Sequence, residues 1–180
     1  MSVIKFDATL ININDWIIIR LPTDKSATLT SRGQVMVKGT INDFAFIDAL
    51  EPDGNGGHWL LVNADMQKFA NVTVDDTAKL SIELTKDWPE PTILADWQTV
   101  LDTDTHIKTS WLTLTPMARW EWLRWISSTA NVDTRKKRIE VSCSKLRRGE
   151  RRPCCFNRSM CCVPQVSKSG VLIGALKTSK

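Results

Sequence analysis

The sequence predicts an α+β fold, in which about six short strands form a small barrel or sandwich and a helical segment follows. Apolar and polar residues alternate through most of the first 90 residues, which is typical of half-buried strands. Beyond residue 91 the apolar spacing becomes helical. The chain has 180 residues, of which 42% are hydrophobic, so it is long enough and apolar enough to build a core.

Six segments of the first part are predicted strands, because each is alternating or continuously apolar and ends at a turn signal. Asn14-Asp15 marks one turn, and Asn42-Asp43 is the two-residue signal of a hairpin. A short helical turn is expected within residues 23–32, and one or two more at 64–70. The predicted strands cover residues 5–13, 16–21, 33–38, 44–50, 58–63 and 78–86.

Two prolines, Pro89 and Pro91, mark the predicted boundary between the strands and the helices. We therefore expect three regions: a barrel domain at 1–90, a helical region at 91–150 and a cysteine-rich tail at 151–180. The tail is neither clearly helical nor clearly stranded, although residues 171–176 could form one strand.

Three helices are expected in the second region, each from its apolar spacing and its end signals. The first covers residues 92–102. The second begins after the cap Thr115 with a proline in its first turn and runs to about Ser128. Asn131 or Asp133 caps the third, which continues to residue 146 and ends at Gly149.

Charge is unevenly distributed along the chain. Residues 1–133 carry 11 Lys and Arg against 18 Asp and Glu, whereas residues 134–180 carry 13 against 2. This asymmetry favours either pairing of the basic segment with the protein's own acidic part or attraction of an external anion, such as a nucleic acid, an anionic lipid surface or an acidic protein. The densest cluster, and hence the predicted ligand-binding surface, is Arg135, Lys136, Lys137 and Arg138.

The cysteines do not predict a metal site. Cys154, Cys155, Cys161 and Cys162 form two adjacent pairs, and adjacent cysteines rarely converge on one ion, so the spacing is not that of a zinc site. Cys143 stands apart. The only two histidines, His58 and His106, are too few for a histidine metal triad. We predict no metal and no cofactor.

An alternative interpretation is a small enzyme with a pocket near Arg32, His58 and Trp59, which lie beside a glycine-rich loop. This loop, residues 53–57, lacks the Gly-Lys-Ser/Thr ending of a phosphate cradle and joins two strands rather than a strand and a helix. No residue is therefore assigned a catalytic role from the sequence.

No stretch of eighteen apolar residues occurs, and the N-terminal MSVIKFDATL lacks the basic flank and apolar run of a signal peptide. The sequence thus predicts no membrane span and a cytoplasmic protein.

Several motifs resemble known families. Phe6 and Ala8 form an opening Phe-x-Ala, residues 16–22 run from Trp to Leu-Pro, and residues 31–41 read S-R-G-x-V-x-V-x-G-T-I. In this order they resemble the bacterial domain of unknown function DUF1905, whose members are similar to a small closed β-barrel. Residues 114–138 resemble the region called YdeI/OmpD-associated or bacteriocin protection. The resemblance covers about residues 3–148 and implies no established catalytic residues and no cofactor.

The function predicted from these observations is a non-enzymatic binding module with a basic C-terminal arm, which takes an anionic ligand, a nucleic acid or an acidic protein. An enzyme should instead present convergent titratable groups in one cleft, with perturbed pKa values. The sequence specifies neither the ligand nor the oligomeric state.

Overall fold

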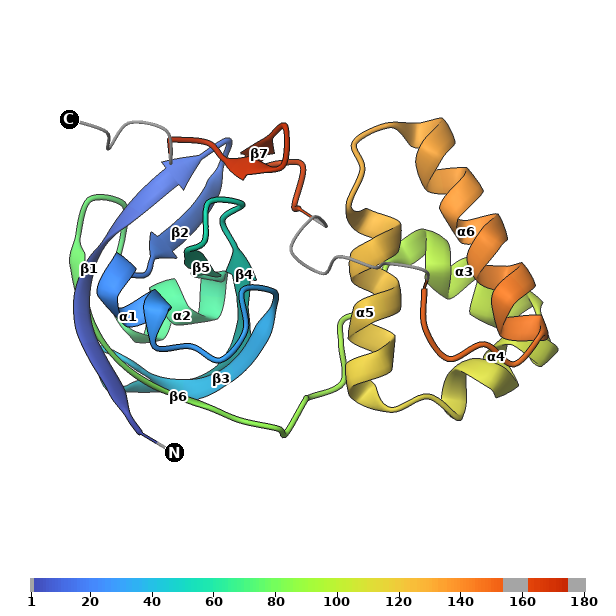
Figure 1. Cartoon of the computed structure of the whole chain (residues 1–180), viewed down its shortest axis with the longest axis horizontal. Helices are drawn as coiled ribbons and strands as arrows, with labels where there is room; N and C mark the ends of the chain where they lie inside the picture. Colours follow the sequence, from blue (N-terminus) through green and yellow to red (C-terminus); the bar gives the residue numbers. More distant parts are fainter. Residues whose placement is uncertain (1, 154–161, 175–180) are drawn as a thin grey trace. The chain divides into compact units, whose positions relative to one another are not determined.

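A computed structural model describes residues 2–153 and 162–174 and divides the chain into two compact units (Figure 1). The barrel unit contains Met1–Asp87 together with Arg158–Lys180, and the helical unit is Trp88–Asn157. The helical unit is therefore inserted, in chain order, between the barrel strands and a C-terminal segment that belongs to the barrel.

Six antiparallel strands close into a barrel, so the predicted closed barrel of about six strands is confirmed. Around the barrel they follow the order β1-β2-β5-β4-β3-β6, and β1 closes it by pairing Ile4 with Ile82 of β6. The strands are β1 (Ile4–Ile13), β2 (Trp16–Arg20), β3 (Val35–Ile41), β4 (Phe44–Pro52), β5 (His58–Leu61) and β6 (Thr77–Leu84).

Both predicted turn signals form tight hairpins. Asn14 and Asp15 have φ values of 49° and 67°, and Asn42 and Asp43 have 42° and 70°. Two consecutive positive φ values define a type I′ turn, whose twist matches that of the strands it joins, and Asn and Asp tolerate this conformation.

The barrel interior is filled with apolar side chains. Leu10, Val37 and Leu60 are fully buried there, and the helix α2 (Ala64–Phe69) adds Met66 to the same core. A second short helix, α1 (Thr23–Ala27), precedes β3. The interior is thus a packed core, as is usual in small barrels.

The C-terminal segment of residues 162–174, called the strap from here on, packs on the outside of the barrel. It contains the two-residue strands β7 (Ser167–Lys168) and β8 (Val171–Leu172), of which β8 falls within the predicted strand 171–176. Val166 and Leu172 of the strap pack against Ile13, Ile18 and Trp59 of the barrel. These contacts make the strap part of the barrel unit.

Four helices form the helical unit: α3 (Ala95–Thr103), α4 (Thr105–Leu112), α5 (Pro116–Ser127) and α6 (Val132–Arg147). The predicted caps Thr115 and Asn131 accept hydrogen bonds from the first turns of α5 and α6. The sequence did not predict α4, which is capped by Asp104. Trp97, Trp111 and Trp122 are buried in the shared core of the four helices.

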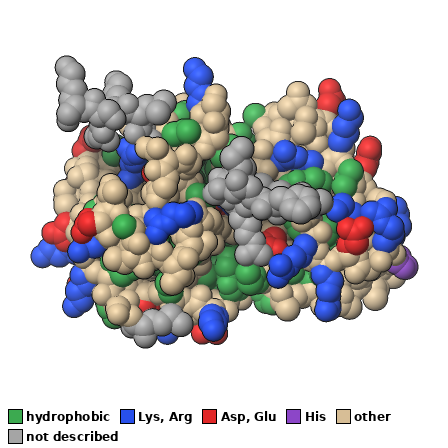
Figure 2. Space-filling model, in the orientation of Figure 1, with side chains coloured by type: hydrophobic (Ala, Val, Ile, Leu, Met, Phe, Trp, Pro, Cys, Tyr) green, Lys and Arg blue, Asp and Glu red, His purple; other side chains and the backbone are tan. Residues whose placement is uncertain are grey.

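On the face drawn in Figure 2, basic and acidic side chains of the helical unit are interspersed rather than separated into two fields. No helix in the described part of the chain is long and apolar enough to cross a membrane.

Candidate functional site

Arg32, predicted as a ligand-binding residue, forms hydrogen bonds within its own unit. Its Nη1 donates to the carbonyls of Ser26 and Gly56, at 3.3 and 3.0 Å. Its Nη2 donates to the carbonyls of Ala27 and Leu29, at 3.1 and 2.9 Å. The guanidinium therefore fastens α1 and the segment after it to the glycine-rich loop.

His58 lies in a closed polar cage. Only 1% of its surface is exposed, and its Nε2 is 3.0 Å from the carbonyl oxygen of Gly33. Since a carbonyl only accepts, Nε2 carries the proton and donates. Nδ1, at 2.7 Å from Oγ of Ser26, then accepts the proton of that hydroxyl. Burial lowers the pKa of His58, against the opposing effect of the Gly33 hydrogen bond, so the ring is neutral at pH 7.

The Ser26–His58 distance is that of a nucleophile and its general base. However, Ser26 has no exposed surface, and the second ring nitrogen of His58 meets a carbonyl rather than an orienting carboxylate. A substrate cannot reach the hydroxyl in this conformation. The geometry favours a structural role, in which the pair joins α1 to β5.

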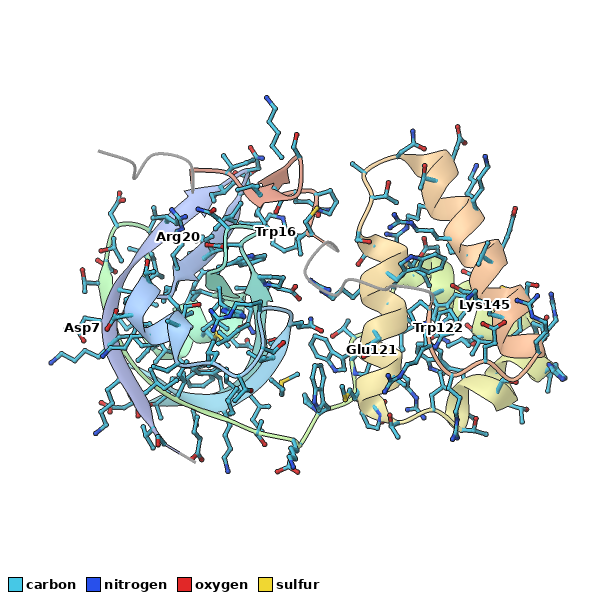
Figure 3. All side chains as sticks on the ribbon, in the orientation of Figure 1. Asp7, Trp16, Arg20, Glu121, Trp122 and Lys145 are labelled. Carbon is cyan, nitrogen blue, oxygen red and sulfur yellow. The ribbon has the colours of Figure 1, made fainter. Side chains whose placement is uncertain are left out.

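Trp59, the third predicted residue of this region, lies under the strap. Its side chain is 1% exposed, and its Nε1 donates to the carbonyl of Pro52 at 3.3 Å. Trp16 packs in the same cluster, and Arg20 donates to the carbonyl of Gly174 of the strap at 3.2 Å (Figure 3). The structure thus brings Arg32, His58 and Trp59 to neighbouring positions, where the side chains of His58 and Trp59 are both buried.

Asp48 is a further titratable group of the barrel. It pairs in register with Val37, whose side chain points into the core, and therefore faces the interior. Burial raises the pKa of the Asp48 carboxyl, and Oδ1 accepts the backbone N–H of Ala49. The charge of Glu51 also raises this pKa, and Glu51 itself accepts a hydrogen bond from Nε2 of Gln34 at 2.5 Å.

Ion pairs within the helical unit neutralise much of the basic segment. Arg135 of α6 holds Asp96 of α3 through two hydrogen bonds, from Nε to Oδ2 at 2.6 Å and from Nη2 to Oδ1 at 3.0 Å. These bonds lower the pKa of Asp96. Arg147 pairs with Asp104 at 2.5 Å. Two further cations pair with one acid near the end of α6, namely Lys145 and Arg148 with Glu150.

Arg138 is held differently, because its described partners are neutral. Its Nη1 donates to the carbonyl of Trp125 at 2.7 Å and to Oγ of Ser128 at 2.6 Å. The guanidinium carbon lies 5.5 Å from the centre of the Trp125 ring. Lys136 and Lys137, directly before it, are exposed and form no ion pair with a described residue. The three side chains form what we call the α6 cationic patch.

Sequence reasoning missed two partners at these sites. Trp125 and Arg138 are 13 residues apart on different helices, and Ser26 and His58 are 32 apart. Neither spacing carries a local signal.

The thiols and carboxylates provide no metal centre among the described residues. Cys143 is half-buried, and burial raises the pKa of its thiol. Cys162, at the start of the strap, is a free thiol, while Cys154, Cys155 and Cys161 lie outside the described residues.

Comparison with known proteins identifies two families along the chain. Residues 4–82 match the domain of unknown function DUF1905, and residues 90–149 match the family described as bacteriocin-protection, YdeI or OmpD-associated. The first range covers β1 to β5 and most of β6, the second covers helices α3 to α6, and the strap lies beyond both. No match was found among the curated proteins.

Proposed function

We propose that this chain, a DUF1905 domain followed by a bacteriocin-protection, YdeI or OmpD-associated region, is a non-enzymatic binding module that takes a polyphosphate partner on the α6 cationic patch. The partner to which we commit is a nucleic acid, bound through the phosphates of its backbone.

The state of Arg138 carries the proposal. Its Nη1 is fixed by Trp125 and Ser128, and the ring of Trp125 lies against its guanidinium, so the side chain is pre-oriented. Neither Nε nor Nη2 has a partner within residues 2–153 and 162–174. A guanidinium with a fixed plane and an available edge suits an oxyanion, because its N–H groups match two anionic oxygens.

Electrostatics support the same surface. Residues 88–153 carry 12 Lys and Arg against 8 Asp and Glu. Lys136 and Lys137 add two exposed charges beside Arg138, whereas Asp133 and Glu140 lie on either side of the patch along α6. The patch is therefore short, with room for about three phosphate contacts, and no element for reading bases accompanies it.

Binding of this kind is weak, indifferent to base sequence and sensitive to salt. Three phosphate contacts predict a slope of about −3 when the logarithm of the association constant is plotted against that of salt concentration. The alternative of an enzyme around Arg32, His58 and Trp59 has less support, because His58 and Trp59 are buried and both terminal nitrogens of Arg32 donate to backbone carbonyls.

The test is fluorescence anisotropy with a short labelled DNA duplex, titrated between about 50 and 200 mM salt. In the double variant Lys136→Gln/Lys137→Gln, we expect weaker binding and a slope reduced by about two. Arg138→Lys keeps the positive charge but loses the paired N–H groups of the guanidinium. It should therefore weaken binding with little change in the slope of the salt dependence.

A matched control removes the same charge from the barrel. Lys5→Gln/Lys79→Gln replaces two exposed lysines on β1 and β6, and binding should be unchanged. Equal losses in both double variants would show attraction to net charge alone and would overturn the assignment to α6. So would an absence of any salt-dependent binding by the unmodified chain.

A further inference from the structure

The strap covers an apolar face of the barrel but is held by few polar contacts. The face is formed by Ile13, Ile18 and Trp59. Leu172 gives the strap one backbone hydrogen bond to the barrel loop, from its N–H to the carbonyl of Asp53 at 2.8 Å. Two side-chain bonds add to it, one from Asn14 to the carbonyl of Gln165 at 2.8 Å and one from Arg20 to the carbonyl of Gly174 at 3.2 Å. A short segment with so few contacts opens locally at a lower cost than the barrel unfolds.

The glycine-rich loop, residues 53–57, is the part of the barrel on which the strap rests, through contacts with Gly170 and Leu172. A Cβ atom on Gly54 would lie 2.0 Å from the carbonyl oxygen of Gly170, so the two backbones touch. The Asp53 carboxylate shapes the loop by accepting the N–H groups of Asn55 and Gly57, at 2.7 and 2.8 Å. Any shift of this loop therefore displaces the strap directly.

His58 stands at the end of that loop, inside its closed cage, and is followed by Trp59 under the strap. The charged groups that face the ring are Arg32, Glu51 and Asp53. On α1, Asp24 and Lys25 pair with each other at the surface, at 3.3 Å. Both nitrogens of the neutral ring are satisfied by Ser26 and Gly33, so the cage fits the uncharged form.

We propose that His58 makes the strap acid-sensitive: protonation of its ring loosens the glycine-rich loop, releases residues 162–174 and uncovers the apolar face around Trp59. This device does not depend on the anion site proposed for α6.

The chemistry of the step is a single proton uptake. The proton enters at Nδ1, which in the closed state accepts the hydroxyl proton of Ser26. Nδ1 then becomes a donor, so the hydroxyl must rotate and donate elsewhere. A positive charge also appears in a buried site beside Arg32, which itself holds Gly56 of the loop. Since His58 and Trp59 are consecutive on β5 and point to opposite faces, we infer that loosening of the glycine-rich loop, rather than removal of the strap itself, admits water to the ring and relieves both costs.

The direction follows from linkage. Burial lowers the pKa of His58 in the closed state below its ordinary 6.5, and an opened cage restores that value. Protons therefore favour the open state. Opening should become more frequent by up to about tenfold for each unit of pH below 6.5, until the closed state itself is protonated.

The experiment is residue-resolved amide hydrogen exchange on the full chain between about pH 7.5 and 5, expressed as protection factors so that the intrinsic pH dependence cancels. The Leu172 amide reports the strap. The fully buried Leu10, whose amide donates to the carbonyl of Asp76 at 2.9 Å, reports the barrel. We expect the protection of Leu172 to fall as the pH drops below 6.5, by up to about tenfold for each unit of pH, while that of Leu10 stays constant.

Two variants separate the steps. His58→Gln keeps a donor and an acceptor but takes up no proton, and should make the protection of Leu172 independent of pH. Asn14→Asp tolerates the positive φ of its turn but cannot donate to the strap, and should lower the protection by the same factor at every pH.

An NMR titration of the unmodified protein provides a second readout that does not depend on the folding of any variant. The His58 ring signal and the Leu172 amide signal should change with one midpoint. Separate midpoints, an unchanged Leu172 protection, or an equal loss at Leu10 would each overturn the proposal.

Discussion

Replacing the ion pair between Arg135 and Asp96 should measure how much the basic segment contributes to the stability of the folded helical unit. The pair joins α6 to α3 through two hydrogen bonds of 2.6 and 3.0 Å, and the side chains are 28% and 38% exposed. Exposed pairs typically contribute about 0.2–1 kcal/mol, and a bidentate geometry belongs at the upper end of that range. We therefore expect a coupling energy of about 1 kcal/mol.

The assay is a double-mutant cycle of Arg135→Gln, Asp96→Asn and the double variant, in which urea unfolding gives each free energy of unfolding. Because Arg135 lowers the pKa of Asp96, the stabilisation is present above the ordinary value of 3.8 and is lost as the pH falls through the lowered value in the folded state. Concentrated salt should reduce the coupling energy, since both groups are partly exposed.

Lys136→Gln is the matched control for this cycle, because it removes one charge from the neighbouring, exposed position. Its effect on the free energy of unfolding should lie within about 0.5 kcal/mol. A coupling energy near zero at low salt would refute the reasoning that acids of the helical unit stabilise its basic helix.

Two further predictions concern packing. Gly39→Ala should lower the free energy of unfolding by about 3 kcal/mol, because the added Cβ would lie 2.1 Å from the backbone oxygen of Ser81. Gly56→Ala should lower it by only about 1 kcal/mol, because nothing lies within 4 Å of that Cβ and the positive φ is the only cost. Urea unfolding of the two alanine variants tests the difference. Trp97→Phe should lower the free energy of unfolding by about 1 kcal/mol less than Trp122→Phe does. The reason is that Nε1 of buried Trp97 has no partner among the described residues, whereas Nε1 of Trp122 donates to the carbonyl of Arg151 at 3.3 Å. An equal loss of thermal stability in the two variants would contradict this.

The barrel was predictable because its decisive signals are local. Asn14-Asp15 and Asn42-Asp43 fix two hairpins by their own backbone preferences, and alternation assigns the faces of the strands. The helix α4 escaped prediction because only Ile107 and Trp111 of its eight residues are buried, so its apolar stripe is too thin to stand out.

The site depended on contacts that no local pattern encodes. Leu172 meets Asp53 across more than a hundred residues, and nothing in the tail indicates that it returns to the barrel. His58 was identified as a candidate by its residue type, yet its role follows from Ser26 and Gly33, which only the folded chain brings to it. The pairing of Arg135 with Asp96 likewise required the helices to be assembled.

The insertion of Trp88–Asn157 within the barrel unit has a consequence for how the chain unfolds. The strap closes a loop whose length is set by whatever lies between β6 and residue 162. While the helical unit is folded, hydrogen bonds from Trp120 to Pro89 and from Trp122 to Arg151 hold its two described ends on α5. If its helices unfold, the same residues become a flexible chain. The entropic cost of closing the loop when the strap binds the barrel then rises with the logarithm of the loop length. The order of the segments in the chain thus makes unfolding of the helices weaken the packing of the strap on the barrel.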